Sequence, residues 1–223
     1  MVPTMSLYAP LNVRVATPRL ELLGATDDLL ESLAPLVAAG KATADPPPWD
    51  DPSAFYEPDP ETRVQQWLRA VWRSRGTVRP DAWRLNFVVI VDGEPVGQQD
   101  LNGNDFDDFG SVESTSWVSS DFRCRGIGSE MRSAILHLAF EGLGAAMAHS
   151  EGAFDNAGSN AVSERLGYER NGKAWATHQG KPVLGQRWLL DRETWQARRR
   201  NDIGMSGVTE CRRALGIEPA AGT

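Results

Sequence analysis

Several kinds of residue and segment are scarce in this chain of 223 residues, and each scarcity excludes a class of protein. Only two cysteines occur, Cys124 and Cys211, so a disulfide framework is excluded, and without a CxxC pair a structural zinc site is not indicated. No window approaches 18 consecutive apolar residues, so we expect no membrane-spanning segment. The formal net charge of −7 argues against a general nucleic-acid binder, which usually carries a basic domain.

The N-terminal segment also lacks the basic region and the continuous apolar stretch of a secretion signal, so we expect a cytoplasmic protein. The chain is 41% hydrophobic and 24% charged, which is ordinary for a globular protein. A chain of this length can bury about 70% of its unfolded surface without help from disulfides or metal. We expect a single domain over residues 1–223, with a core of about 13–190 and a C-terminal helix and tail over 191–223.

The order of apolar and turn-forming residues predicts a mixed α/β (α+β) domain. Strand patterns occupy 13–24, 85–91, 95–101, 112–119, 145–154 and 183–190. Helix patterns occupy 26–40, 59–76, 125–144, 156–167 and 191–200. Asp92-Gly93 is the preferred residue pair for a two-residue hairpin turn, which predicts that the strands on either side of it are antiparallel neighbours.

One join between a strand and a helix carries the residues of an anion site. Gly126 and Gly128 stand where the helix begins, and the first N–H groups of a helix have no partners within it. The helix dipole favours an anion there, and Arg123 and Arg125 add two positive charges. We interpret this join as a pyrophosphate site, although the same residues also occur in ordinary strand–helix turns.

Together with the hairpin before it and a polar helix start about 27 residues downstream, this join makes the sequence resemble the GNAT superfamily of acyl-CoA-dependent N-acyltransferases. The run RCRGIG (123–128) fits the superfamily's Q/R-x-x-G-x-G/A loop. Asn156-Ala157-Gly158-Ser159 and Leu166-Gly167-Tyr168 fit the N-x-x-S … L-G-F/Y signature of the branch that contains ribosomal-protein N-terminal acetyltransferases. The resemblance covers about 13–190. A closer resemblance, which extends through the Cys211 tail, is to a mycobacterial GNAT protein described as a succinyltransferase.

The resemblance implies a GNAT fold, whose mixed central sheet is flanked by helices and splayed between the fourth and fifth strands, 112–119 and 145–154. Acyl-CoA is then a co-substrate bound in that cleft, with its pantetheine amides paired to the strand edge at Trp117 and Val118. The backbone of the glycine loop would hold the pyrophosphate, through Arg123, Cys124, Arg125, Gly126, Ile127, Gly128 and Ser129.

The resemblance assigns two further residues to the cofactor. Asn156 would bond the pantetheine arm, and Ser159 would approach the thioester sulfur and protonate the departing thiolate. The residues alone also allow plainer roles, a helix N-cap for Asn156 and a surface polar group for Ser159. Ser163 stands where many GNAT enzymes carry an acidic tyrosine, so general-acid catalysis by that tyrosine is not expected here.

An amine must be neutral before it attacks a thioester, and neutralising a lysine-like amine at pH 7 costs roughly 4.6 kcal/mol. A general base is therefore useful. Glu113 lies ten residues before Arg123, a spacing that matches the base of histone-type GNAT enzymes, although it also suits a residue that binds the acceptor or a bridging water. His178, in the predicted loop before the last strand, is the second candidate base. We expect His149 at a strand end and His137 on a helix surface, and no spacing indicates a metal site.

The prolines and acids of residues 45–61 predict a long loop. In this superfamily that region often covers the acceptor site, and its negative charge would favour a cationic amine. Trp49, Phe55 and Tyr56 would supply contact area. A solvated connector with its aromatic side chains against the core is the alternative.

We therefore expect transfer of an acetyl group from acetyl-CoA to a primary amine, on a small molecule or a protein, by direct attack in a ternary complex. Succinyl-CoA is the alternative donor, and its terminal carboxylate would need a cation such as Arg84, Arg187 or His178. A catalytically silent acyl-CoA sensor or interaction module is the alternative of another class. We expect no nucleic-acid or membrane partner and no metal, while homo-oligomerisation stays open.

Overall fold

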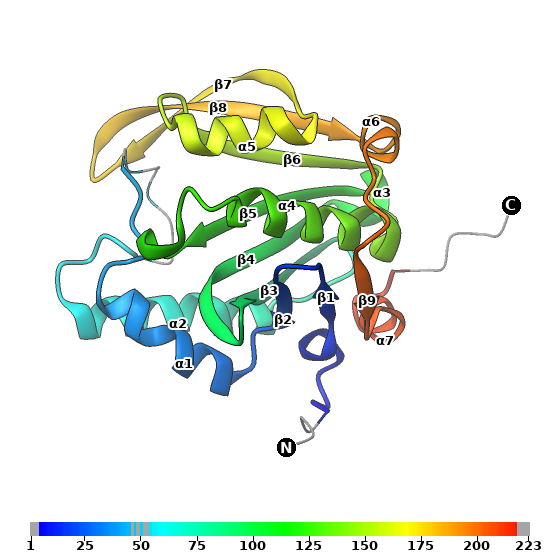
Figure 1. Ribbon diagram of the computed structural model, residues 1–223, viewed down its shortest axis with the longest axis horizontal. Helices are drawn as coiled ribbons and strands as arrows, with labels where there is room; N and C mark the ends of the chain where they lie inside the picture. Colours follow the sequence, from blue (N-terminus) through cyan, green and yellow to red (C-terminus); the bar gives the residue numbers. More distant parts are fainter. Residues whose placement is uncertain (1–4, 46, 48–49, 51–53, 218–223) are drawn as a thin grey trace, which may run out of the picture.

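The computed structural model describes residues 5–45, 47, 50 and 54–217. Its strands form one mixed sheet in the order β7-β8-β6-β5-β4-β3-β2-β1-β9 (Figure 1). The strands are β1 (Arg14–Ala16), β2 (Glu21–Gly24), β3 (Ala82–Val91), β4 (Glu94–Asn104), β5 (Ser111–Val118), β6 (Met147–Ala153), β7 (Glu169–His178), β8 (Lys181–Asp191) and β9 (Gly204–Ser206). The helices are α1 (Asp27–Ala38), α2 (Pro60–Gly76), α3 (Phe106–Phe109), α4 (Ile127–His137), α5 (Ala157–Leu166), α6 (Arg192–Ala197) and α7 (Val208–Ala214). Short 3-10 helices η1 (Ala9–Asn12) and η2 (Ser120–Phe122) and a π-helical end of α4, η3 (Leu138–Leu143), complete the elements.

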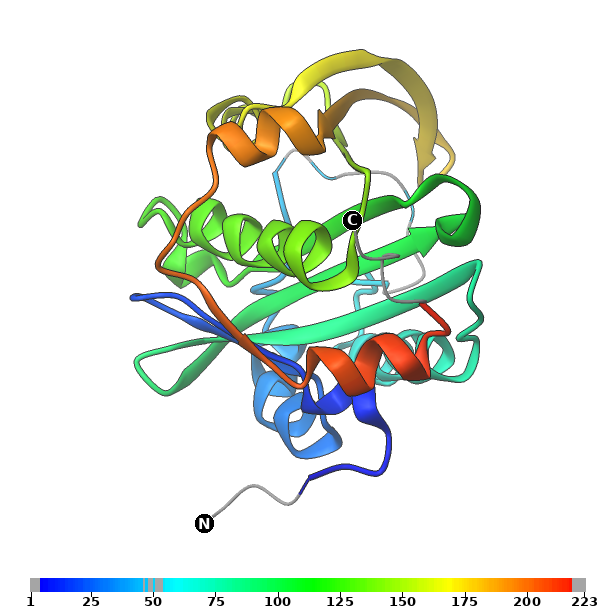
Figure 2. The same cartoon turned by 90° about the vertical axis from the view of Figure 1, so that its right-hand side faces the viewer.

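Helices cover both faces of the sheet. α4 and α5 pack against β4, β5 and β6 on one face, and α1 and α2 pack against β3 and β4 on the other. Successive side chains of a strand point to opposite faces, so Phe87 of β3 joins the larger core under α4 while Val88 joins the smaller core under α1 and α2. α7 packs beside η1 near the start of the chain (Figure 2).

Most predicted element boundaries are confirmed by their caps. Thr26 and Asp59 accept hydrogen bonds from backbone N–H groups in the first turns of α1 and α2, and Gly167 ends α5 with a φ of 90°. Asp92 and Gly93, with φ of 52° and 83°, form the predicted turn between β3 and β4. The fold class predicted from the sequence is therefore correct.

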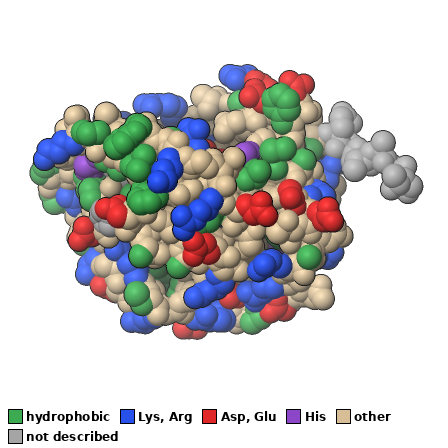
Figure 3. Space-filling view, turned by 90° about the horizontal axis from the view of Figure 1, so that it is seen from above, with side chains coloured by type: hydrophobic (Ala, Val, Ile, Leu, Met, Phe, Trp, Pro, Cys, Tyr) green, Lys and Arg blue, Asp and Glu red, His purple; other side chains and the backbone are tan. Residues whose placement is uncertain are grey.

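The prediction of a loop before the last strand is wrong, because residues 169–178 form β7. This strand lies at the edge of the sheet and is almost entirely exposed, with the Trp175 side chain 72% accessible, so it has no apolar face for a sequence pattern to reveal. Figure 3 looks onto this part of the molecule and shows hydrophobic side chains at the surface among lysines and arginines. His178, assigned to a loop, is instead the last residue of β7, before the turn at Gln179-Gly180.

The C-terminal predictions also need correction. The helix expected over 191–200 ends at Ala197, and the tail beyond it adds β9 to the sheet and forms α7. His137 is not on a helix surface. Its side chain is buried, with its ring 6.0 Å from that of Trp195, because α6 returns to cover this end of α4. Periodicity within one helix cannot show which later segment covers it.

Within the described ranges, no helix is both long and apolar enough to cross a membrane.

Candidate active site

The sheet opens between β5 and β6. These two strands are parallel and pair only from Ser111–Met147 to Glu113–His149, after which no pairing continues. On its other side β5 stays paired to β4 as far as Val118. The strands diverge toward the end at which α4 begins (Figure 1), so the predicted split between the fourth and fifth predicted strands is present. Beyond Glu113 it leaves the β6-facing edge of β5, up to Val118, without a neighbouring strand in the described part of the chain, although the Val118 carbonyl oxygen accepts a hydrogen bond from Arg123 Nε.

The start of α4 lies at the open end of this split. Gly126 precedes the helix with a φ of 79°, a left-handed conformation that suits glycine, and no side chain caps the first turn. Ser129 Oγ lies 3.5 Å from Arg165 Nη1, which brings a cation of α5 to the same turn. Sequence reasoning missed this arginine, and the sequence carries no local signal for it. The uncapped N–H groups in the first turn of α4, together with the positive charge of Arg165, provide what an anion such as pyrophosphate requires.

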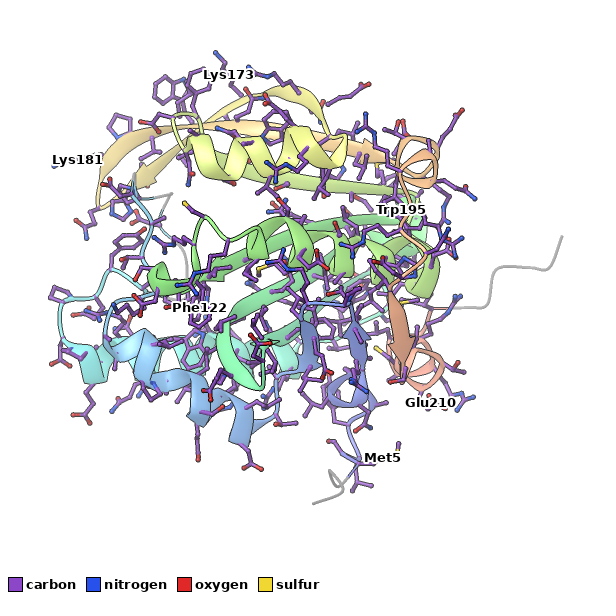
Figure 4. All side chains as sticks on the ribbon, viewed as in Figure 1. Met5, Phe122, Lys173, Lys181, Trp195 and Glu210 are labelled. Atoms are coloured by element: carbon purple, nitrogen blue, oxygen red, sulfur yellow. The ribbon has the colours of Figure 1, made fainter. Side chains whose placement is uncertain are left out.

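A second arginine missed by sequence reasoning, Arg19, holds the backbone of the glycine loop before α4 through a hydrogen bond. Arg19, in the turn between β1 and β2, donates a hydrogen bond from Nη2 to the Arg125 carbonyl oxygen at 2.7 Å. The Arg125 guanidinium in turn lies over the Phe122 ring, 5.2 Å from its centroid, and Phe122 marks the approach to α4 in Figure 4. The loop thus combines positive charge with a fixed backbone, and Cys124 within it is exposed with a φ of 58°.

The Arg123 side chain has a structural contact that its motif position did not reveal. Its guanidinium donates to the carbonyl oxygens of Thr43, at 2.6 Å, and Val118, at 3.1 Å. It therefore ties the segment after α1 to the end of β5. A role for Arg123 in holding pyrophosphate through its backbone stays a prediction, as do those of Cys124, Ile127 and Gly128.

The helix start downstream of β6 supplies the two residues assigned to the pantetheine arm and the thioester. Asn156 Oδ1 accepts a hydrogen bond from Ser159 N at 3.0 Å, so Asn156 is the N-cap of α5. This bond uses its carbonyl oxygen and not its amide N–H groups. Ser159 Oγ would lie 3.0 Å from a Cβ at Gly152, so the hydroxyl sits directly against β6 where that strand has left β5. The Ser163 hydroxyl is buried beneath it.

Glu113 stands at the last pair before the strands separate. It lies beside Asn102 of β4 and His149 of β6. Burial raises the pKa of the Glu113 carboxyl, the negative charge of Glu151 raises it further, and Arg84 and Arg187 oppose the rise. A carboxyl group with a raised pKa is better matched to accept a proton near neutral pH. His149, expected at a strand end, is inside β6, and burial followed by the charge of Arg187 lowers its pKa.

A cavity of about 520 Å³ adjoins Glu113 on the face covered by α2. Its lining includes Arg84, Asn86, Gln98, Asn102, Glu113 and the α2 residues Arg73 and Ser74. Beneath it the buried Asp100 carboxylate accepts hydrogen bonds from Arg84 at 2.5 Å, Asn86 at 2.9 Å and Gln98 at 2.8 Å. Sequence reasoning missed this network, whose one signal was the polar residues at alternate positions of β3 (Arg84 and Asn86) and of β4 (Gln98, Asp100 and Asn102).

The second candidate base belongs to a different group of contacts. The His178 ring packs edge-on to Tyr56, with centroids 4.9 Å apart, and its Nδ1 is 3.8 Å from Asp50 Oδ1. Asp50 also accepts a hydrogen bond from Gln179 N at 2.8 Å. The loop after α1 is thereby attached to the β7–β8 turn, while Glu113 lies with Arg84, Glu151 and Arg187. No described contact joins the two candidate bases.

The two described aromatic residues of the loop contact different groups, Tyr56 the His178 ring and Phe55 the end of β5. Phe55 packs edge-on to Trp117 at 5.6 Å between centroids, so the loop reaches the end of β5. Trp49 lies outside the described residues. Among the residues described, no group of three or more His, Cys, Asp or Glu side chains is arranged to hold a metal ion.

Comparison with known proteins places this arrangement among acetyltransferases. Residues 19–169 match the family described as acetyltransferase (GNAT) domain. The structure is similar to RimJ from Mycobacterium smegmatis in complex with CoA-disulfide, with a TM-score of 0.69 and 19% identity over 83% of this chain and 90% of that one. It is also similar to RimL, a ribosomal L7/L12 alpha-N-protein acetyltransferase in complex with coenzyme A, with a TM-score of 0.64 and 19% identity over 80% of this chain and 97% of that one.

Proposed function

The chain belongs to the GNAT acetyltransferase family, and on that premise we propose that it transfers a short acyl group from acyl-CoA to a primary amine by direct attack in a ternary complex. The observation that carries the proposal is the split between β5 and β6, with the uncapped start of α4 at its open end and Glu113 at its closed end. An extended arm can pair with the free edge of β5 while its diphosphate rests on α4. Acetyl-CoA and succinyl-CoA are the two donors we propose.

The reaction forms one bond and breaks one. The amine nitrogen attacks the thioester carbonyl carbon, a C–N bond forms, and the C–S bond breaks when the tetrahedral intermediate collapses. The amine loses a proton to a general base, and the departing CoA thiolate gains one to become the free thiol. The product is an amide, and no electrons are exchanged with another reactant.

We assign the general base to Glu113. It lies at the closed end of the split, it lines the cavity beneath α2, and burial raises its pKa toward the range in which a carboxylate accepts a proton efficiently. The positive charges of Arg84 and Arg187 oppose that rise of the Glu113 pKa. His178 is the second candidate, held by Tyr56 and Asp50 at the β7–β8 turn.

Ser159 is the proposed proton donor to the thiolate. Its half-buried hydroxyl lies against Gly152, beyond the last pair of β5 and β6, and Asn156 fixes the first turn of α5 by capping it. The Asn156 amide N–H groups are the part of that side chain proposed to bond the pantetheine arm. The Asn156 amide and the Ser159 hydroxyl, both at the start of α5, therefore line one side of the proposed cofactor site.

The acceptor is proposed to enter through the cavity beside Glu113. RimL is described as an acetyltransferase of a protein α-amine. An α-amine is the easier acceptor, since neutralising it at pH 7 costs roughly 1.4 kcal/mol. Asp50 of the acidic loop accepts a hydrogen bond from Gln179 N in the β7–β8 turn. The negative charge of the Asp50 carboxylate is proposed to attract a cationic amine toward the site.

The experiment is steady-state release of CoA thiol from acetyl-CoA and succinyl-CoA with a panel of amines that includes peptide N-termini, lysine and polyamines, and with mass spectrometry of the products. Amine-dependent release with formation of the amide is expected. Tight CoA binding by calorimetry without turnover on any amine would instead support a catalytically silent acyl-CoA sensor or interaction module, and would contradict the proposed activity.

A further inference from the structure

A buried cation without a counter-charge lies behind the proposed thioester site. Arg132 of α4 is 6% exposed, and its Nη1 donates to Ser150 Oγ of β6 at 2.9 Å. Its Nε has no hydrogen-bond partner. Throughout the described residues no Asp or Glu forms an ion pair with it. A guanidinium removed from water is costly unless an anion and hydrogen-bond acceptors replace the water.

The side chains around Arg132 offer hydroxyl groups and no negative charge. Ser114 of β5 and Tyr168 are each less than 5% exposed. The Ser114 and Tyr168 hydroxyls are buried without a hydrogen bond of ordinary geometry, although both lie beside one another and beside Arg132. Arg132 and the hydroxyls of Ser114, Ser150 and Tyr168 thus form a buried cluster with one positive charge and several O–H donors but no anion, which is the partner such a cluster would bind.

The group lies at the closed end of the split between β5 and β6. Ser114 and Ser150 are the first residues after the last pair of these strands, and their side chains face α4. Arg132 comes six residues after Gly126, roughly 9 Å along α4 from the start of the helix. A donor whose diphosphate rests at Gly126 and whose arm runs along the edge of β5 therefore carries its acyl group toward Arg132.

We propose that Arg132, together with Ser114 and Ser150, binds the terminal carboxylate of a dicarboxylic acyl group, so that the preferred donor is an acyl-CoA of the succinyl type. This inference rests on the proposed function and names the substrate class of the same site. An acetyl group ends in a methyl and leaves Arg132 without an anion. The cations considered from the sequence already face carboxylates of the chain: Arg84 faces Asp100, Arg187 faces Glu151 and His178 faces Asp50.

The test compares two donors that differ only at the end of the acyl chain. Succinyl-CoA and butyryl-CoA have the same number of chain atoms up to the terminal group, which is a carboxylate in one and a methyl in the other. With one working amine, the wild-type protein is expected to show a kcat/KM for succinyl-CoA at least tenfold above that for butyryl-CoA. Arg132→Met is expected to lower that ratio at least tenfold, and Arg132→Lys to lower it less, because lysine keeps the charge but loses the planar fork.

Matched variants separate this role from a structural one. Arg69→Met removes an exposed arginine of α2 and should leave the ratio as in the wild type. Ser150→Ala removes one hydroxyl of the pocket without removing the charge, and a several-fold lower ratio is expected. If Arg132→Met does not fold, Arg132→Lys and Ser150→Ala carry the same comparison.

The outcomes are distinct. A wild-type ratio near one, or a ratio that the Arg132 and Ser150 variants leave unchanged, overturns the carboxylate pocket while acyl transfer itself stands. Failure of every acyl-CoA to support amine-dependent release contradicts the proposed function instead.

Discussion

Replacing Gly126 by aspartate tests the assignment of the α4 start to the pyrophosphate, and asparagine at the same position is the control. Both side chains have nearly the same size and both tolerate a left-handed backbone better than other residues do. The conformational cost of a Cβ at a φ of 79°, roughly 1–2 kcal/mol, is therefore shared by the two variants. The Cβ would lie 3.1 Å from Arg19 Nη1, the flexible end of a side chain that can move aside.

The difference between the variants is the charge. A carboxylate about 4 Å from a phosphate oxygen is repelled by about 1 kcal/mol in water and by about 4 kcal/mol at the effective dielectric constant near a protein surface. Aspartate also competes for the positive charges of Arg19 and Arg125. Since about 1.4 kcal/mol corresponds to a tenfold change in affinity, Gly126→Asp is expected to bind CoA at least fivefold more weakly than Gly126→Asn.

Isothermal titration calorimetry with CoA, at low and at high salt, measures this difference directly. The gap between the two variants should narrow at high salt, because screening weakens the repulsion. Thermal unfolding of both variants checks that they are equally folded. Equal CoA affinity for the aspartate and asparagine variants at low salt would refute the placement of the pyrophosphate at Gly126.

Three further predictions concern catalysis, stability and thiol chemistry. Glu113→Gln should lower kcat by about 10²- to 10⁴-fold while CoA affinity changes little, as measured by thiol release and calorimetry, and full activity from about pH 6 to 9 would exclude Glu113 as the base. The pKa of Glu113 is raised in the folded protein, so the wild type loses folding free energy as pH rises through that pKa and the buried carboxyl becomes charged. Glu113→Gln stays neutral, so it should melt at a higher temperature than the wild type near pH 8 and lose this advantage below about pH 4. A lower melting temperature than that of the wild type at pH 8 would contradict the burial argument. Burial raises the pKa of the Cys211 thiol to about 12, so only the exposed Cys124 should react with iodoacetamide in the native protein, and peptide mapping that finds Cys211 modified at an equal rate would contradict this.

The parts of the fold that were predicted correctly are those whose signal is local. Asp92-Gly93 specifies a tight turn by itself, and Thr26 and Asp59 mark helix starts because their side chains bond the helix that follows. β7 had no such signal, since an exposed edge strand does not need an apolar face. His137 was misplaced because α6, more than fifty residues later, covers it.

The site shows the same limit. The glycine loop at 126–128 and the position of Glu113 follow from short motifs and spacing. The partners that set their chemistry are distant in the chain: Arg19 lies 106 residues before the carbonyl it bonds, and Arg132 and Ser150 meet across 18 residues. Arg132 occupies an ordinary helix position in the sequence, and only burial without a carboxylate distinguishes it.

A crystal structure with a thioether analogue of succinyl-CoA, which cannot transfer its acyl group, tests the central claim most directly. We expect the diphosphate on the N–H groups at the start of α4, the pantetheine arm along the free edge of β5 at Trp117 and Val118, and the terminal carboxylate within hydrogen-bond distance of Arg132. An analogue bound outside the split between β5 and β6, or with its acyl end directed away from both Glu113 and Arg132, would contradict the account.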